Sequence, residues 1–175
     1  MSQWNILATS YIRQGHYLIR ILNRYGEFKR TPFRDVLLGH VDNTDEFIDA
    51  LVREGPERLR SLSQIVPLDK EFQFELSDIS EKMKEAVSPY MDSLADRTFH
   101  VRVSRRGHKG EISSLEIEKE LDAFIMESLV KAGKKAKVDF DDPDFIVIAE
   151  TLGNWAGVGL ISREMKERCH YIRVR

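Results

Sequence analysis

The sequence predicts an α+β protein made of two α/β parts. Residues 1–76 alternate between apolar, β-branched runs and amphipathic stretches in the order strand, helix, strand pair, helix, strand. This is the βαββαβ plan of a ferredoxin-like domain. Residues 97–175 begin with an alternating strand that leads through a glycine-containing loop into a long amphipathic helix. A chain of 175 residues, 42% of them hydrophobic, is long enough for two small cores.

The elements of residues 1–76 follow from local patterns. We expect a strand at residues 4–12, a helix at 15–25, a strand pair or bulged edge strand at 28–41, a helix from residue 44 and a closing strand at 66–74. Gly26 is expected to end the first helix, and Asn43 or Thr44 to begin the second. The Gly55-Pro56 pair ends the second helix.

Residues 77–96 are predicted to form a connecting helix between the two domains. Ile79, Met83 and Val87 recur at every fourth position, which gives the segment one apolar face. Pro89 is expected to kink the helix or to start a second turn. We therefore expect a ferredoxin-like domain at residues 1–76 and a second domain at residues 97–175.

The stretch 98–131 carries the predicted anion site. Apolar and polar side chains alternate over residues 98–104, as in a half-buried strand. Ser113 and Glu116 have the spacing of a capping box, so a helix should begin there. Between strand and helix, Gly107 and Gly110 are surrounded by four cationic or titratable residues, namely Arg105, Arg106, His108 and Lys109. Free N–H groups and the dipole of a helix N-terminus favour a phosphate at such a loop.

The same loop also fits a plainer interpretation. The GxxG form of residues 107–110 resembles the backbone clamp of KH domains, but that clamp joins two helices, whereas this loop follows a strand. An exposed turn with solvated charges would have the same composition. After the long helix, Lys134 and Lys135 extend the positive charge, and Trp155 on a turn is expected either to stack on a base or to anchor a hairpin in the core.

Charge and motifs exclude several function classes. The formal net charge of −2 excludes a globally basic nucleic-acid binder, so a nucleic-acid site must be a local patch. The single cysteine, Cys169, has no partner for a disulfide, and the sequence shows neither a secretory signal nor an apolar run long enough to span a membrane. We therefore expect a cytoplasmic protein. No catalytic constellation, cofactor motif or metal-ligand spacing is recognisable, so we expect a protein that is not an enzyme.

The C-terminal part resembles the THUMP domain. The resemblance rests on the strand FHVRVSRRG, the helix LEIEKELDAFIMESL and the segment KVDFDDPDFIVIAETLGNWAGVGLISREM, and it covers residues 97–172. In particular, the sequence resembles standalone THUMP proteins that assist tRNA cytidine acetylation. The resemblance implies a ferredoxin-like companion domain, tRNA as the partner and, since this chain has no room for a fused catalytic domain, a separate tRNA-modifying enzyme.

The resulting hypothesis is an RNA-binding adaptor that recognises tRNA and presents it to that enzyme. The residues expected to contact RNA are Arg102, Arg105, Arg106, His108, Lys109, Ser113, Lys134, Lys135 and Arg163. Two alternatives stay open. The near-neutral pI of about 6.2 is compatible with a protein-interaction or regulatory module without RNA. The helix N-terminus is compatible with an enzyme for a small phosphorylated ligand.

Overall fold

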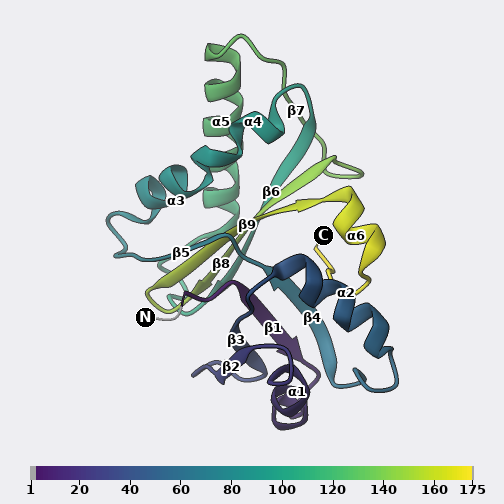
Figure 1. The fold of residues 1–175 in the computed structure, drawn as a ribbon. Coiled ribbons are helices and arrows are strands. Elements are labelled where there is room, and N and C mark those ends of the chain that lie inside the picture. Colours follow the sequence, from purple (N-terminus) through teal and green to yellow (C-terminus); the bar gives the residue numbers. More distant parts are fainter. Residues whose placement is uncertain (1–2, 175) are drawn as a thin grey trace. The chain divides into compact units, whose positions relative to one another are not determined.

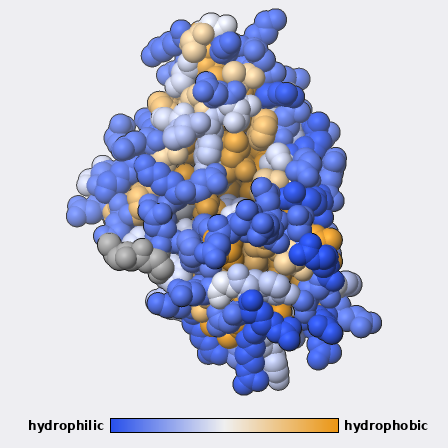
Figure 2. Space-filling model, in the orientation of Figure 1, coloured by the Kyte–Doolittle hydropathy of each residue, from blue (hydrophilic) through white to orange (hydrophobic). Residues whose placement is uncertain are grey.

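The computed structural model describes residues 3–174 and confirms the predicted α+β class. The chain divides into two compact units, unit 1 (residues 1–68 and 164–173) and unit 2 (residues 69–163 and 174–175). Figure 1 shows the elements of both in chain order. The face shown in Figure 2 is mostly hydrophilic, with apolar side chains gathered in patches. Within residues 3–174, no helix is both long enough and apolar enough to cross a lipid bilayer.

Unit 1 has a four-stranded antiparallel sheet with the strand order β2-β3-β1-β4. Its elements are β1 (Ile6–Ser10), α1 (Gly15–Leu22), β2 (Glu27–Arg30), β3 (Val36–His40), α2 (Thr44–Glu54), β4 (Leu62–Pro67) and the short α6 (Arg163–Arg168). The order of the first six elements is βαββαβ, as the sequence predicts. Asn43 begins α2, because its side chain accepts a hydrogen bond from the Glu46 N–H at 3.0 Å.

Two expectations for unit 1 were wrong. Helix α1 ends at Leu22, before the predicted Gly26. Gly26 instead lies against β3, where a Cβ atom would come within 2.3 Å of the His40 carbonyl oxygen. The predicted closing strand is in fact two strands, because β4 ends at Pro67 and β5 (Lys70–Gln73) pairs with the sheet of unit 2. The division between the units accordingly falls at residue 68 and not at residue 76.

Unit 2 has a five-stranded mixed sheet with the strand order β5-β9-β8-β6-β7. After β5 its elements are α3 (Ile79–Val87), the 3-10 helix η1 (Ser88–Tyr90), α4 (Met91–Leu94), β6 (Thr98–Arg106), α5 (Ser114–Lys131), β7 (Lys137–Val138), β8 (Phe145–Leu152) and β9 (Trp155–Ser162). Strand β6 is parallel to β7 and β8, whereas β9 is antiparallel to β8 and to β5. The kink expected at Pro89 is the 3-10 helix.

The predicted connecting helix is part of the core of unit 2. Met83 and Val87 of α3 are fully buried in one cluster with Phe99 of β6 and Leu121 and Ile125 of α5. The segment was expected to be a helix that connects the two domains. Its partners are α5 and the sheet, which follow later in the chain.

Helix α5 also covers one edge of β6. Strand β7 pairs only with the first two residues of β6, Thr98 and Phe99. Farther along the same edge, the Val101 N–H donates to the Asp122 carboxylate at 3.2 Å and the Val103 N–H donates to the Glu118 carboxylate at 2.8 Å. Two carboxylates of α5 therefore satisfy backbone donors that a neighbouring strand would otherwise accept.

Candidate nucleic-acid interface

The loop between β6 and α5 is held in one conformation by its backbone. Gly107, His108 and Gly110 all have positive φ angles, of 91°, 49° and 83°. The N–H groups of Glu111 and Ile112 both donate to the His108 carbonyl at 3.0 Å. Glycine adopts such angles without strain, which explains the two glycines of the GxxG form. The Ile112 side chain is buried in the core of unit 2 and anchors the loop at the start of α5.

His108 links this loop to the turn between β8 and β9. Its Nδ1 lies 2.9 Å from a Glu111 carboxylate oxygen, and its Nε2 lies 2.6 Å from the Asn154 side-chain oxygen. The hydrogen bond to Glu111, and then that to Asn154, raise the pKa of His108 above its usual range. Both ring nitrogens face acceptors, so the arrangement favours the protonated imidazolium. His108 therefore connects the loop to the turn between β8 and β9, and Glu111 compensates its charge when the ring is protonated.

Arg106 is engaged inside unit 2. Its guanidinium forms an ion pair with the Glu150 carboxylate of β8, whose side chain is only 1% exposed. Burial raises the pKa of Glu150, and the charge of Arg106 opposes that rise. Removing one partner of a buried ion pair leaves an uncompensated charge, which is strongly destabilising. Arg106 is thus better placed to hold β6 against β8 than to bind a ligand.

Arg105 and Lys109 carry the positive charge that this loop leaves uncompensated. The Arg105 guanidinium donates to the Gly107 carbonyl, and Lys109 is exposed. No carboxylate within residues 3–174 forms an ion pair with either side chain. Ser113 begins α5 as predicted, because its hydroxyl accepts a hydrogen bond from the Glu116 N–H at 3.3 Å. Two cations and a helix N-terminus thus share one end of unit 2.

Three other predicted residues do not belong to this loop. Lys134 and Lys135 follow the C-terminus of α5, an 18-residue helix that is about 27 Å long at 1.5 Å per residue. Figure 1 shows these two ends of α5. Arg163 lies beyond the end of β9, where its guanidinium contacts carboxylates of Asp142 at 3.2 Å and Asp144 at 3.3 Å. The nine predicted residues therefore do not form a single patch.

Arg102 lies on β6 next to α5. Its guanidinium is 3.8 Å from the Glu118 carboxylate, and its side chain is 40% exposed.

The acidic turn before β8 has structural roles of its own. The Asp139 carboxylate accepts hydrogen bonds from the N–H groups of Asp141 and Asp142. Within residues 3–174 there is no cluster of three or more His, Cys, Asp or Glu side chains arranged for a metal ion.

Residues 74–160 match the family model of the THUMP domain. The chain carries a THUMP domain. The match includes Arg105 and the loop at residues 107–113, which carries Lys109 and is called the THUMP loop below. The match begins 23 residues before the expected boundary at residue 97. Helices α3 and α4, which were expected to connect two domains, therefore lie within the matched THUMP domain.

Known proteins of several kinds are similar to this chain. A tRNA sulfurtransferase of Desulfurococcus amylolyticus is 37% identical over 114 residues, which are 62% of this chain and 22% of the relative. The crystal structure of TrmN from Thermus thermophilus has a TM-score of 0.64 at 18% identity and covers 89% of this chain and 44% of its own. A 4-thiouridine synthetase, solved in an RNA complex with bound ATP, has a TM-score of 0.57 at 18% identity. The match covers 91% of this chain and 41% of the synthetase chain. The chain spans less than a third of the curated relatives that it matches.

The structure places two residues that the sequence did not single out, Asn154 and Lys82, in a pocket with Trp155. Trp155 is 36% exposed and lines a pocket of about 430 Å³ with Phe74, Lys82 and Asn154, the residue that holds His108. Trp155 is not among the buried core residues of unit 2, and its stacking on a base stays a prediction. Asn154 carries no local signal, because its partner His108 is 46 residues away in the chain. Lys82 lies on α3 and donates to the Gln73 carbonyl of β5.

Proposed function

We propose that this protein binds tRNA and presents it to a separate tRNA-modifying enzyme. The observation that carries the proposal is the position of Arg105 and Lys109 within the matched THUMP domain. Arg105 lies near the end of β6 and Lys109 on the loop that leads from β6 to the N-terminus of α5, and neither forms an ion pair with a carboxylate among residues 3–174. The names of the relatives point in the same direction, since one is a tRNA sulfurtransferase and another was solved with RNA.

The same reasoning assigns a binding role and no catalytic role to this chain. The charged side chains around the loop are suited to phosphate oxygens, which position an RNA without reading its sequence. Trp155 and the pocket beside it would supply a stacking surface for an unpaired base. Chemistry on the RNA would then be performed by the partner enzyme, and a tRNA cytidine acetylase is the partner that the resemblance of the sequence suggests.

The test compares two double variants of the full chain. Arg105→Ala with Lys109→Ala removes the two uncompensated cations of the loop. Lys70→Ala with Lys119→Ala removes two exposed lysines of unit 2 outside the predicted site. Because a hydrogen bond to a charged group contributes about 1.5–3 kcal/mol, the loop variant should weaken tRNA binding about tenfold or more, and the control should stay within about twofold. Filter binding of total tRNA at several salt concentrations measures the affinity of both variants.

The salt dependence of tRNA binding is an independent measurement of the phosphate contacts. Loss of two phosphate contacts should reduce the slope of log K against log salt concentration by about 1.4 to 1.8. Equal affinity and slope in the two variants would exclude the loop as the RNA-binding site. A protein that retains protein partners from nuclease-treated lysate but binds no tRNA would support the protein-interaction alternative. A third variant, Lys134→Ala with Lys135→Ala, tests whether the other end of α5 also contacts the RNA.

A further inference from the structure

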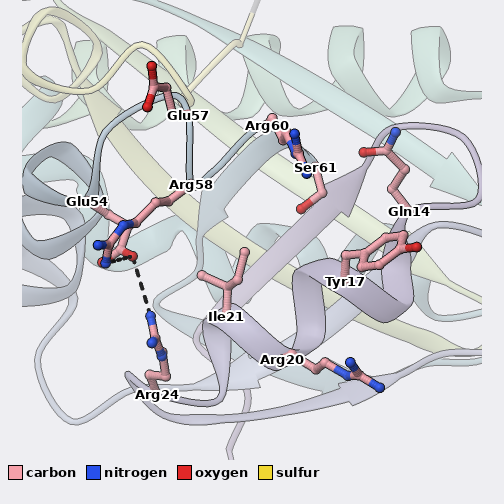
Figure 3. Close-up of a pocket in the computed structure, with 10 residues that line it drawn as sticks. All are labelled: Gln14, Tyr17, Arg20, Ile21, Arg24, Glu54, Glu57, Arg58, Arg60 and Ser61. Carbon is pink, nitrogen blue, oxygen red and sulfur yellow. Dashed lines mark hydrogen bonds and ion pairs between the residues drawn. The ribbon is translucent and has the colours of Figure 1, made fainter.

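Unit 1 contains a basic cavity that none of the functions discussed so far uses. The cavity has a volume of about 990 Å³ and lies between α1, the end of α2 and the segment that leads into β4 (Figure 3). Six of its lining side chains define what we name the arginine pocket: Arg20, Arg24, Arg58, Arg60, Tyr17 and Ser61. All of them belong to unit 1, so the pocket is separate from the THUMP loop of unit 2.

The arginine pocket has an excess of positive charge. Its lining contains four arginines and two glutamates, Glu54 and Glu57. Glu54 lies 3.5 Å from both Arg24 and Arg58 and also accepts a hydrogen bond from the Tyr25 hydroxyl. Arg20 and Arg60 are exposed and have no carboxylate partner among residues 3–174. Two guanidinium groups are thus available to an anion, and the Glu54 pairs fix two more at the wall.

Ser61 supplies a second, independent observation. Its side chain lines the pocket, the residue is only 3% exposed, and its hydroxyl has no hydrogen-bond partner among the described residues. Buried hydroxyls in folded proteins are as a rule paired with protein, water or ligand. An unpaired hydroxyl at the wall of a cavity surrounded by guanidinium groups therefore indicates a polar occupant of the cavity.

Tyr17 and Ile21 indicate that the occupant of the arginine pocket has a planar, apolar part as well as a negative charge. Tyr17 is 57% exposed, and Figure 3 shows Tyr17 and Ile21 on α1, with Arg60 and Ser61 on the segment that leads into β4. A planar guanidinium fork matches the oxygens of a phosphate, and an exposed aromatic ring stacks on a planar base. The volume is that of a cavity for a small organic ligand.

We propose that the arginine pocket binds a nucleotide, with its phosphate held by guanidinium groups of the pocket and its base stacked on Tyr17. The nucleotide is either free or part of an RNA chain, because both present the same phosphate and base. The proposal does not depend on RNA binding at the THUMP loop, which lies in the other unit.

The experiment uses the full chain and three ligands. These are AMP, adenosine, and a single-stranded RNA pentamer with a 5′-phosphate, each titrated by isothermal calorimetry or by NMR. The test variant is Arg20→Ala with Arg60→Ala, and the matched control is Arg30→Ala with Arg34→Ala, which removes two arginines of unit 1 from outside the pocket. Thermal melting of each variant confirms that it is folded.

We expect the test variant to weaken AMP or pentamer binding at least tenfold, and the control to change it less than twofold. Adenosine should bind more weakly than AMP, and Tyr17→Ala should weaken the binding of both, because both present the same base. Binding of both AMP and pentamer identifies free nucleotides as ligands, whereas binding of the pentamer alone identifies a nucleotide within RNA. The proposal would be overturned if neither AMP nor the pentamer bound. It would also be overturned if the test and control variants lost affinity equally. The pentamer is titrated into proteins that also carry Arg105→Ala with Lys109→Ala, so that RNA binding at the THUMP loop does not contribute to the result.

Discussion

Replacing Asp122 with Asn should stabilise the protein at neutral pH. Burial, followed by repulsion from Glu118, raises the pKa of Asp122 from 3.8 to about 6, although the Val101 N–H donates to it. A folded-state pKa above the unfolded value means that the group favours folding below about pH 3.8, and that this contribution is lost as the pH rises through about 6. At neutral pH the ionised Asp122 is therefore unfavourable for the fold. Asn retains an oxygen for the Val101 N–H and carries no charge.

The magnitude follows from the same pKa. A rise from 3.8 to about 6 corresponds to about 3 kcal/mol at 1.36 kcal/mol per unit. Because the side chain is only half-buried, solvent screening reduces this to about 1–2 kcal/mol. For a chain of this length, that gain raises Tm by about 3–6 °C.

Urea denaturation and thermal melting at pH 4 and pH 7.5 test this reasoning. The stability of Asp122→Asn should match that of the unsubstituted protein at pH 4 and exceed it at pH 7.5. Asp144→Asn is the control of opposite sign, because the Thr98 N–H lowers the pKa of Asp144, so its ionised form stabilises the fold above about pH 3.8. A variant of Asp122 that is equally stable or less stable than the unsubstituted protein at pH 7.5 would refute the argument from burial.

Three further substitutions test other parts of the structure. Ser113→Ala removes the cap of α5 and should lower the free energy of unfolding by about 1 kcal/mol, as measured by urea denaturation. Gly26→Ala places a Cβ within 2.3 Å of the His40 carbonyl oxygen and should destabilise the protein by about 2 kcal/mol or more, and a neutral result would contradict this close packing. Glu111→Gln should lower the pKa of His108 towards its usual value in an NMR titration. The stabilisation from protonated His108 is present below about pH 6.5 and is lost as the pH rises through the higher folded pKa.

Local pattern was sufficient for those elements whose determinants lie close together in the chain. Ser113 predicted the start of α5 because a cap and its N–H partner are three residues apart, and the period of the apolar positions predicted which face of α5 is buried. The alternation over β6 predicted its buried face for the same reason.

The predicted site was less accurate because charge in a sequence carries no information about its partners. Arg106 and Glu150 are 44 residues apart, and only the parallel register of β6 and β8 brings them together. Arg163 is neutralised by a turn that precedes β8. The separation of Lys134 from the loop, in contrast, follows from the length of α5 and was already contained in the sequence.

The carboxylates of α5 along β6 have a consequence for self-association. An open strand edge is a template on which another chain can add a strand, and such additions lead to domain swapping and fibrils. Glu118 and Asp122 occupy the outward N–H groups of Val101 and Val103, so an incoming strand would have to displace two charged acceptors from this edge. Protonation of Asp122 leaves an oxygen for the Val101 N–H, so this edge of β6 stays covered by α5 in mild acid as well.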